Sequence, residues 1–490
     1  MKTPPRLDRR TFLRQAACAA VGTMGLTNAL FDLRRIGAAT IQNSAAMASD
    51  YRALVCLFLF GGNDSNNMVV PSDTTDYNSY VAARGVLALP AAGQAGGILP
   101  LNLIPGRGVN DGRTFGFHPN FIDYASPNGA LPGLQSLFNS GNLAILGNVG
   151  TLIYPTTQND FRTNQAILPP QLFSHSDQQV EWQTSVPQTV NATGWGGRVA
   201  DLLNASFGST QISTCISLNG TNTFEVGTGV VPYSVSPSGA IALNGYTAGS
   251  AAGSVSYAVD QLIAASHTNL FEKTFAATTT RALANNQLLS AALALTDPNA
   301  VPYSSFDSSS SLASQLKMVA RLIAAAQNSA SGLNPRRQIF FVSVGGDDTH
   351  GDQLNAQNNL YTELNNSLSA FYAALLQLGV QNQVTTFTSS DFGRTYQTNG
   401  GGSDHGWGSH HLILGGAVQG GGIYGRIPVL QAGGPDDATY GSTGQGRWIP
   451  SVSVDEYAAT LATWFGVSAT DLPTALPNLG NFPSQNLGFI

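Results

Sequence analysis

Short, strongly apolar segments alternate with helical patterns along most of this chain. Such segments are typical of strands that are covered on both faces, where nearly every side chain is apolar. The five clearest are 51–60, 142–150, 337–346, 382–390 and 411–418. Their alternation with helices predicts an α/β fold, in which a mostly parallel central sheet is sandwiched by helices.

Three segments have apolar residues at helical spacing, namely 308–327, 355–379 and 453–465. The middle one is the most regular, because within 354–381 the apolar residues fall on one broad face. That face consists of Leu360, Leu364, Leu368, Phe371, Leu375 and Leu378. We expect it to pack against the sheet.

The segment 205–305 has a different composition from the rest of the chain. Residues 205–255 are rich in Gly, Ser, Thr and Asn, which predicts β-hairpins or long loops. Ala-rich sequence with a helical pattern follows at 257–297. We therefore expect 205–305 to form an insertion or lid on an α/β body.

The first 48 residues are expected to be a twin-arginine export signal. Arg9 and Arg10 precede Thr-Phe-Leu and a weakly apolar stretch, and a small-residue cleavage site follows at 45–49. This assignment leaves 49–490 as the folded domain. It predicts a periplasmic or secreted protein that meets the twin-arginine translocase during export. The apolar stretch is too short and too polar for a stable membrane span.

The number and sign of the charged residues limit the classes of partner that the protein could bind. Charged residues are only 10% of the chain, against roughly 25% in an average soluble domain. Without residues 1–48 the chain has 15 basic and 26 acidic side chains, a net charge of −11. This sign argues against nucleic acid as a partner. Cys56 and Cys215 lie in apolar runs, which favours buried thiols and leaves one disulfide as the alternative.

Acidic and imidazole side chains follow three of the predicted strands. They are Asp64 after the first, Asp348 and His350 after 337–346, and Asp391 after 382–390, where the basic residue Arg394 also follows. Ligands of open parallel sheets bind beyond the carboxyl ends of the strands, so we expect these residues to converge there. Taken singly, Asp64 is equally well explained as the N-cap of the next helix. A single histidine such as His350 is more often a hydrogen-bonded loop residue than a ligand.

A histidine-rich loop, "GGSDHGWGSHH" at 401–411, is expected to join this site. It contains three of the seven histidines of the chain. Asp404, His405 and His410 are the ligand candidates, whereas His411 begins an apolar run and should face away from His410. Carboxylates crowded together repel unless a cation neutralises them. The mixture with imidazoles predicts a divalent metal such as Zn²⁺ or Mn²⁺, and carboxylates with carbonyls would suit Ca²⁺.

Several motifs together resemble a known family. They are "LVCLFLFGGNDSNNMVVP", "SHSDQQVEW", "GWGGR", "GGDDTHGDQ", "FTSSDFGRT" and "SDHGWGSHHLILGGAVQGGGIYG". In this order they resemble the exported bacterial family called domain of unknown function 1501, which is grouped with the alkaline phosphatase and sulfatase superfamily. The resemblance implies an α/β/α sandwich and metal-assisted hydrolysis of phosphate or sulfate esters.

The resemblance also implies a set of metal ligands. Asp64 matches the metal-binding Asp after the first strand, and Asp348 with His350 matches a later Asp and His at shortened spacing. The chain departs from the pattern after 382–390, where Asp391 is not followed by His. Either Asp391 is a ligand and His405 or His410 is the late histidine, or the loop around Asp404 and His405 folds back to supply the pair.

Ser174 is the candidate nucleophile. In the superfamily a nucleophile lies at a helix N-terminus, where backbone N–H groups and the helix dipole favour an anion. Ser174 stands at a predicted N-cap with Asp177 three residues later, so a capping box explains it equally well. Arg394 would hold the oxygens of the ester group.

The sequence thus predicts an exported metal-dependent hydrolase of small-molecule or polymer esters. The alternative is a non-catalytic exported binding protein that keeps the hydrolase fold. Serine hydrolase chemistry without a metal is a weaker option, because no G-x-S-x-G elbow occurs.

Overall fold

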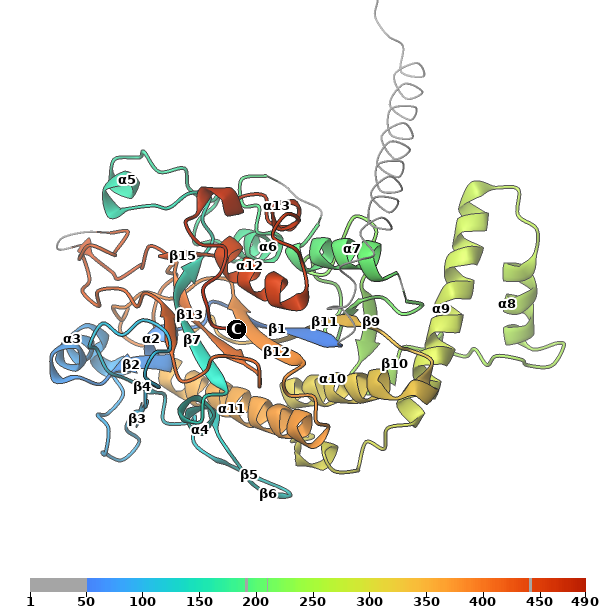
Figure 1. Ribbon diagram of the computed structural model, residues 1–490, viewed down its shortest axis with the longest axis horizontal. Coiled ribbons are helices and arrows are strands. Elements are labelled where there is room, and N and C mark those ends of the chain that lie inside the picture. Colours follow the sequence, from blue (N-terminus) through green and yellow to red (C-terminus); the bar gives the residue numbers. More distant parts are fainter. Residues whose placement is uncertain (1–50, 190–192, 209, 440–442) are drawn as a thin grey trace, which may run out of the picture.

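The computed structural model describes residues 51–189, 193–208, 210–439 and 443–490. The expected export signal, 1–48, lies outside these residues. Helices cover both faces of a large central sheet, as Figure 1 shows. The prediction of an α/β fold with a mostly parallel central sheet flanked by helices is confirmed.

The central sheet has ten strands. In spatial order they are β10 (Gly239–Ala240), β9 (Tyr233–Ser236), β8 (Cys215–Ser217), β11 (Arg337–Gly345), β1 (Arg52–Phe60), β12 (Val384–Ser390), β13 (Ser409–Leu414), β7 (Leu143–Gly150) and β14 (Ile423–Gly425), with β15 (Val452–Ser453) also paired with β7. The strands from β9 to β12 are parallel. Strand β13 runs antiparallel to both of its neighbours. It ends at Leu414, four residues before the predicted end, because Gly415 and Gly416 turn the chain away.

Two core clusters lie on opposite faces of the sheet. Val55 and Leu57 of β1 belong to the first and Cys56 and Phe58 to the second, as the alternation of side chains along a strand requires. The helices of the first face are α4 (Leu134–Asn139), α9 (Leu270–Ala294), α10 (Ser311–Gln327) and α11 (Gln353–Gln377). Those of the second are α6 (His175–Thr184), α7 (Trp195–Phe207), α12 (Val454–Phe465) and α13 (Leu472–Ala475).

Smaller elements complete the fold. They are the helices α2 (Ser65–Met68), α3 (Thr74–Arg84), α5 (Gln158–Arg162) and α8 (Val255–Ala264), the three-stranded sheet β2 (Val69–Pro71), β4 (Phe115–Phe117) and β3 (Leu99–Pro100), and the hairpin β5 (Tyr124–Ser126) and β6 (Gly129–Leu131). None of the described helices is long and apolar enough to cross a membrane.

The segment 205–305 is divided between the body and a projection. Its strands β8, β9 and β10 form one edge of the central sheet, and β9 with β10 makes a hairpin. Helix α8 and the first half of α9 extend away from the sheet (Figure 1). The two cysteines are free and buried on strands separated by β11, which corrects the disulfide alternative.

Candidate functional site

The carboxyl ends of β1, β11 and β12 meet at one edge of the sheet because these strands are parallel and in register. Residue 61 has to be glycine there. Its φ is +117°, and a Cβ atom on it would lie 2.4 Å from the backbone nitrogen of Asp348. This close approach places the loop after β11 directly beside the loop after β1.

Four side chains from three separate segments converge above this edge. Ligand atoms of His175, Asp348 and His405 all lie within 4.8 Å of one another, a grouping that is able to hold a metal ion. The two Nε2 atoms of His175 and His405 are 3.1 Å apart. The Nε2 atom of His350 lies 2.9 Å from that of His405 and 3.1 Å from Oδ1 of Asp348. We call His175, Asp348, His350 and His405 the histidine cluster.

Each imidazole of the cluster is oriented through its other nitrogen. Nδ1 of His175 lies 2.7 Å from Oδ2 of Asp391, and Nδ1 of His405 lies 2.8 Å from the carbonyl oxygen of Phe173. Nδ1 of His350 lies 3.2 Å from Oδ1 of Asp404. Because carboxylates and carbonyls only accept, these contacts put the proton on Nδ1 and leave a lone pair on each Nε2.

The converging lone pairs fit a cation. Two imidazole nitrogens that both carry a lone pair cannot form a hydrogen bond with each other. The carboxylate oxygen of Asp348 adds negative charge at the same place. In a tetrahedral site with metal–ligand bonds of about 2.0–2.1 Å, neighbouring ligand atoms are roughly 3.3 Å apart. The separations between contacting ligand atoms of the cluster, 2.9–3.5 Å, bracket this value.

The surroundings of two cluster residues favour the protonation states that bind a metal. Burial lowers the pKa of His405, which favours the neutral ring. Partial burial raises the pKa of Asp348, but the hydrogen bond and positive charge of Arg394, together with the neighbouring imidazoles, outweigh burial and hold the pKa below its ordinary value. His405 is therefore neutral and Asp348 ionised near neutral pH.

Two loops hold the cluster together. Gly402 packs so tightly that a Cβ atom on it would lie 2.3 Å from the carbonyl oxygen of Thr349. Arg394 and His405 form an isolated β-bridge, which folds the loop 394–405 back over the strand ends. The loop thus folds back and brings His405 to the cluster, but Asp404 contacts His350 and does not join His405 as a pair of ligand candidates.

The guanidinium of Arg394 holds the loops in place and is not free for an ester group. Its side chain is buried, and it donates to the carbonyl oxygens of Ser403 and Gly61 and to Oδ1 of Asp348. Asp391 and Asp404, predicted as ligands, orient His175 and His350 instead.

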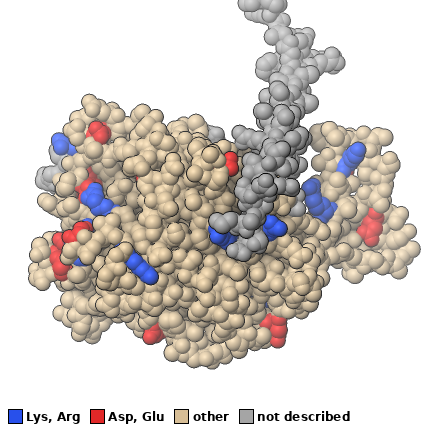
Figure 2. All heavy atoms as spheres, viewed as in Figure 1, with Lys and Arg blue, Asp and Glu red and all other residues tan. Residues whose placement is uncertain are grey.

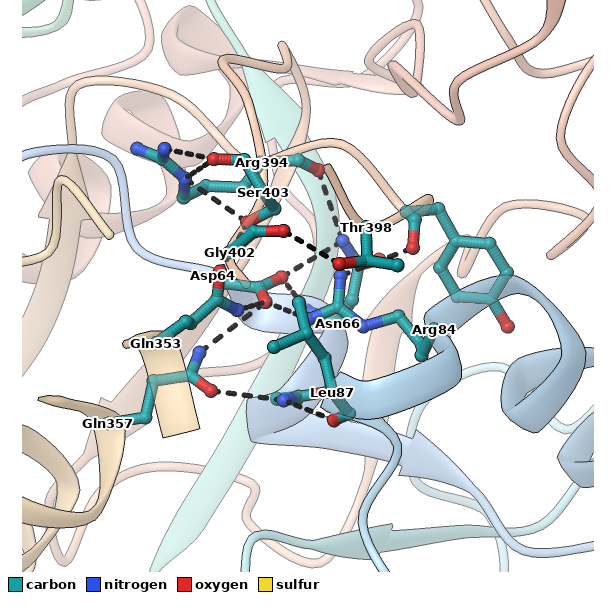
Figure 3. Close-up of polar contacts among 12 residues, drawn as sticks. Asp64, Asn66, Arg84, Leu87, Gln353, Gln357, Arg394, Thr398, Gly402 and Ser403 are labelled. Atoms are coloured by element: carbon teal, nitrogen blue, oxygen red, sulfur yellow. Dashed lines mark hydrogen bonds and ion pairs between the residues drawn. The ribbon is translucent and has the colours of Figure 1, made fainter. Parts of the chain in front are cut away.

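Asp64 and His410 lie apart from the cluster, which differs from the prediction. Asp64 is the N-cap of α2 and is buried against the guanidinium of Arg84. Figure 3 shows its carboxylate surrounded by the donors of Arg84, Asn66 and Gln353. Arg84 supplies the counter-charge that the sequence analysis had assigned to a metal.

The two histidines of β13 are buried and have structural contacts. Nδ1 of buried His410 accepts a hydrogen bond from the backbone nitrogen of Asn148. His411 is buried against Trp182 and Tyr457 on the second face, as expected from its apolar neighbours.

His175 was missed by the sequence analysis, although its neighbour Ser174 was singled out. Ser174 is the N-cap of α6, but its hydroxyl donates to Asp177 at 2.5 Å and makes no hydrogen bond with the backbone of the first turn. The sequence did contain a signal for this residue: a helix begins at a histidine, and a polar residue, Gln179, follows one turn later on the same face. Gln179 donates to the same Asp391 oxygen that contacts His175, at 2.9 Å.

Comparison with known proteins places the chain in a family. The family model described as "Protein of unknown function (DUF1501)" matches residues 51–439, which include the whole histidine cluster. The chain belongs to the DUF1501 family. No curated protein matches it.

A solved structure overlaps this DUF1501 chain only loosely. It is titled "Crystal structure of Ps i-CgsB in complex with k-i-k-neocarrahexaose", and the overlap covers 88% of this chain and 77% of that one. The TM-score is 0.30 and the sequence identity 8%.

Proposed function

We propose that this DUF1501 chain is a metal-dependent hydrolase of phosphate or sulfate esters, of the type found in the alkaline phosphatase and sulfatase superfamily. The observation that carries the proposal is the convergence of three imidazole Nε2 lone pairs and Asp348, each imidazole oriented from behind by an acceptor. Such orientation is typical of metal-ligating histidines.

His175, His405 and Asp348 would hold the ion, with His350 beside them as a fourth ligand. Imidazoles mixed with one carboxylate favour Zn²⁺ or Mn²⁺ over Ca²⁺, which prefers six to eight oxygen ligands. A bound divalent ion supplies Lewis-acid polarisation of an ester oxygen and lowers the pKa of water. Asp391 keeps His175 in the required tautomer, and Arg394 keeps Asp348 in place.

Arg447 is the cation best placed to meet an anionic ester. Its Nε–H donates to the carbonyl oxygen of His405 at 2.8 Å, and its guanidinium lies over the ring of Phe173. Among the residues that the structure describes, neither Nη group of Arg447 has a hydrogen-bond partner. These donors suit two oxygens of a phosphate or sulfate group.

A non-catalytic binding protein is the second candidate. The observation that favours it is that the hydroxyl of Ser174 is held by Asp177 and the guanidinium of Arg394 by backbone carbonyls. Both residues first expected to act on an ester thus have partners within the chain. Under this alternative the cluster binds a metal without turnover.

The deciding experiment measures metal content and turnover on the same preparations. We expect about one equivalent of Zn²⁺ or Mn²⁺ per chain, and hydrolysis of an aryl phosphate or aryl sulfate by the loaded protein. His405→Ala should lose both, whereas His267→Ala, outside the cluster, should keep both. Failure to bind either metal would overturn the proposal, and metal binding without turnover would favour the binding protein.

Export by the twin-arginine pathway is part of the proposal, since it carries folded proteins whose metal is already in place. Its support is the arginine pair Arg9 and Arg10 with the following Thr-Phe-Leu. Replacing both arginines by lysine should leave the protein in the cytoplasm with its metal bound. Normal export of that variant would contradict the assignment.

A further inference from the structure

Helix α9 is only half covered by the rest of the chain. Leu289, Ala292 and Leu293 in its second half belong to the main core. Its first half extends beyond the body together with α8 (Figure 1). The exposed fractions there reach 84% for Phe271 and 72% for Phe275.

The exposed first half of α9 continues the helix face that packs against the core in the second half. Phe271, Phe275, Thr278, Ala282, Asn285 and Leu289 follow one another at alternating intervals of four and three residues. This period of 3.5 is that of a helix–helix seam. The seam is buried from Asn285 onward and exposed before it.

The exposed part of α9 is a poor helix on its own. It contains three consecutive β-branched residues, Thr278–Thr280, which lower helix propensity. Within the described chain its contact with α8 buries Ala276 but leaves the seam bare. Helical stability in proteins comes mainly from packing of an apolar face, so a partner for this seam is expected.

We propose that the exposed seam of α9 pairs with the α9 helix of a second copy of this chain, antiparallel about a two-fold axis between Ala276 and Ala277. In that register Phe271 lies opposite Ala282 of the second copy, and Phe275 lies opposite Thr278. Each large side chain therefore meets a small one on both sides of the axis. This self-complementarity favours a second copy over an unrelated partner, because a two-fold interface uses the same surface twice.

The area is sufficient for a weak dimer. Four phenylalanine side chains bury about 150–250 Å² each, or about 600–1,000 Å² together. The opposing Thr and Ala surfaces bring the pair to about 1,200 Å², the lower limit of specific interfaces. The face of the molecule in Figure 2 has few charges. Glu272, Lys273 and Arg281 flank the seam, and in the proposed register Glu272 lies opposite Arg281 of the second copy, so little electrostatic repulsion opposes association.

Sedimentation of the full chain tests the pairing. We expect dimers with a dissociation constant of about 10 μM, and a loss of at least about tenfold in affinity for Phe271→Glu. Val231→Glu, at a residue exposed to 75% on another loop, is the matched control and should leave the dimer intact.

A mixing experiment tests the register. Phe271→Glu and Ala282→Lys should each be monomeric alone, and together they should form a heterodimer, in which Glu faces Lys on one side and native Phe faces Ala on the other. A wild-type chain that stays monomeric at about 100 μM would overturn the proposal. So would dimers unaffected by Phe271→Glu. Binding of the monomer to phosphatidylglycerol vesicles through Phe271 would overturn it in favour of a lipid surface.

Discussion

At the scale of single residues, partners decide what an acidic side chain does. Asp64 and Asp348 both follow strands of the sheet, and both contact a guanidinium. The carboxylate of Asp64 is fully buried, and its oxygens are surrounded by protein donors. That of Asp348 is 47% exposed and faces three imidazoles. The first residue is therefore structural, and the second is available to a ligand.

The variant Asp64→Asn should destabilise the fold without changing metal content. It leaves the buried guanidinium of Arg84 without its counter-charge, which costs about 3–5 kcal/mol of unfolding free energy. Chemical denaturation and metal analysis of the same sample measure the two effects. Asp348→Asn is the matched control. Its carboxylate is 47% exposed and its contact with Arg394 is only partly buried, so water replaces the lost charge, and the variant should lose metal with a smaller loss of stability in the metal-free protein. Loss of metal in Asp64→Asn at full stability would contradict this assignment.

Glu225 should make stability fall as the pH rises. Burial raises the pKa of its carboxyl from 4.5 to about 8. A hydrogen bond from the side chain of Asn222 to Oε2 opposes this rise but does not cancel it. The unfolded chain loses this proton near pH 4.5 and the folded chain near pH 8, so stability is lost between these values. Glu225→Gln does not titrate, so its melting temperature relative to wild type should rise from pH 5 to pH 8.

The exposed Glu272→Gln controls for the change of charge in that experiment. A difference between Glu225→Gln and wild type that stays constant from pH 5 to pH 8 would show that Glu225 is ionised in the folded protein.

At the scale of elements, the N-terminus of α6 determines the geometry of the cluster. His175 and Gln179 lie one helical turn apart and both contact Oδ2 of Asp391, which follows β12. Asp391 also accepts from the backbone nitrogen of Gly61 after β1. The buried carboxylate thus fixes the direction of one helix relative to two strands.

Replacing Asp391 by Asn should weaken metal binding by about 10–100-fold, the usual effect of removing an orienting partner of a ligand. Asn retains the shape but loses the charge that favours Nδ1–H of His175. Competition with a chromophoric chelator measures the affinity. Asp177→Asn, on the same helix but not in contact with the cluster, is the control, and equal affinities for all three proteins would contradict a role for Asp391.

The sequence predicted the elements better than the residues between them. The strands β1, β7, β11 and β12 and the helix α11 were found within two residues of their bounds, because long apolar runs and regular spacing are local signals. The N-cap role of Asp64 is one of the two explanations that the sequence left open, and it is confirmed. Its ion pair was not predictable, because Arg84 lies on another helix. His175 was missed because its partner, Asp391, is 216 residues away.

At the scale of the whole molecule, the cluster joins three distant parts of the chain. His175, Asp348 and His405 come from α6, from the loop after β11 and from the loop before β13. A ligand that binds only the folded chain stabilises it by mass action, by about 4 kcal/mol at about 1,000 times its dissociation constant.

Chelation should therefore lower the melting temperature of the native protein by several degrees, and added Zn²⁺ or Mn²⁺ should restore it. Differential scanning calorimetry measures the change. The His405→Ala variant should melt at one temperature under both conditions. A wild-type protein that is indifferent to chelator and metal would speak against a bound ion at the cluster.

Strand β1 occupies the middle of the sheet, yet both of its neighbours come from the second half of the chain. Arg52 pairs with Arg337, and Ala53 pairs with Val384. During synthesis at about 5–20 residues per second, β1 therefore waits roughly 15–60 s before either partner leaves the ribosome. Throughout that time an almost wholly apolar strand has no native hydrogen-bonding partner. We therefore expect the nascent chain to need a chaperone that covers β1 until its partner strands are synthesised.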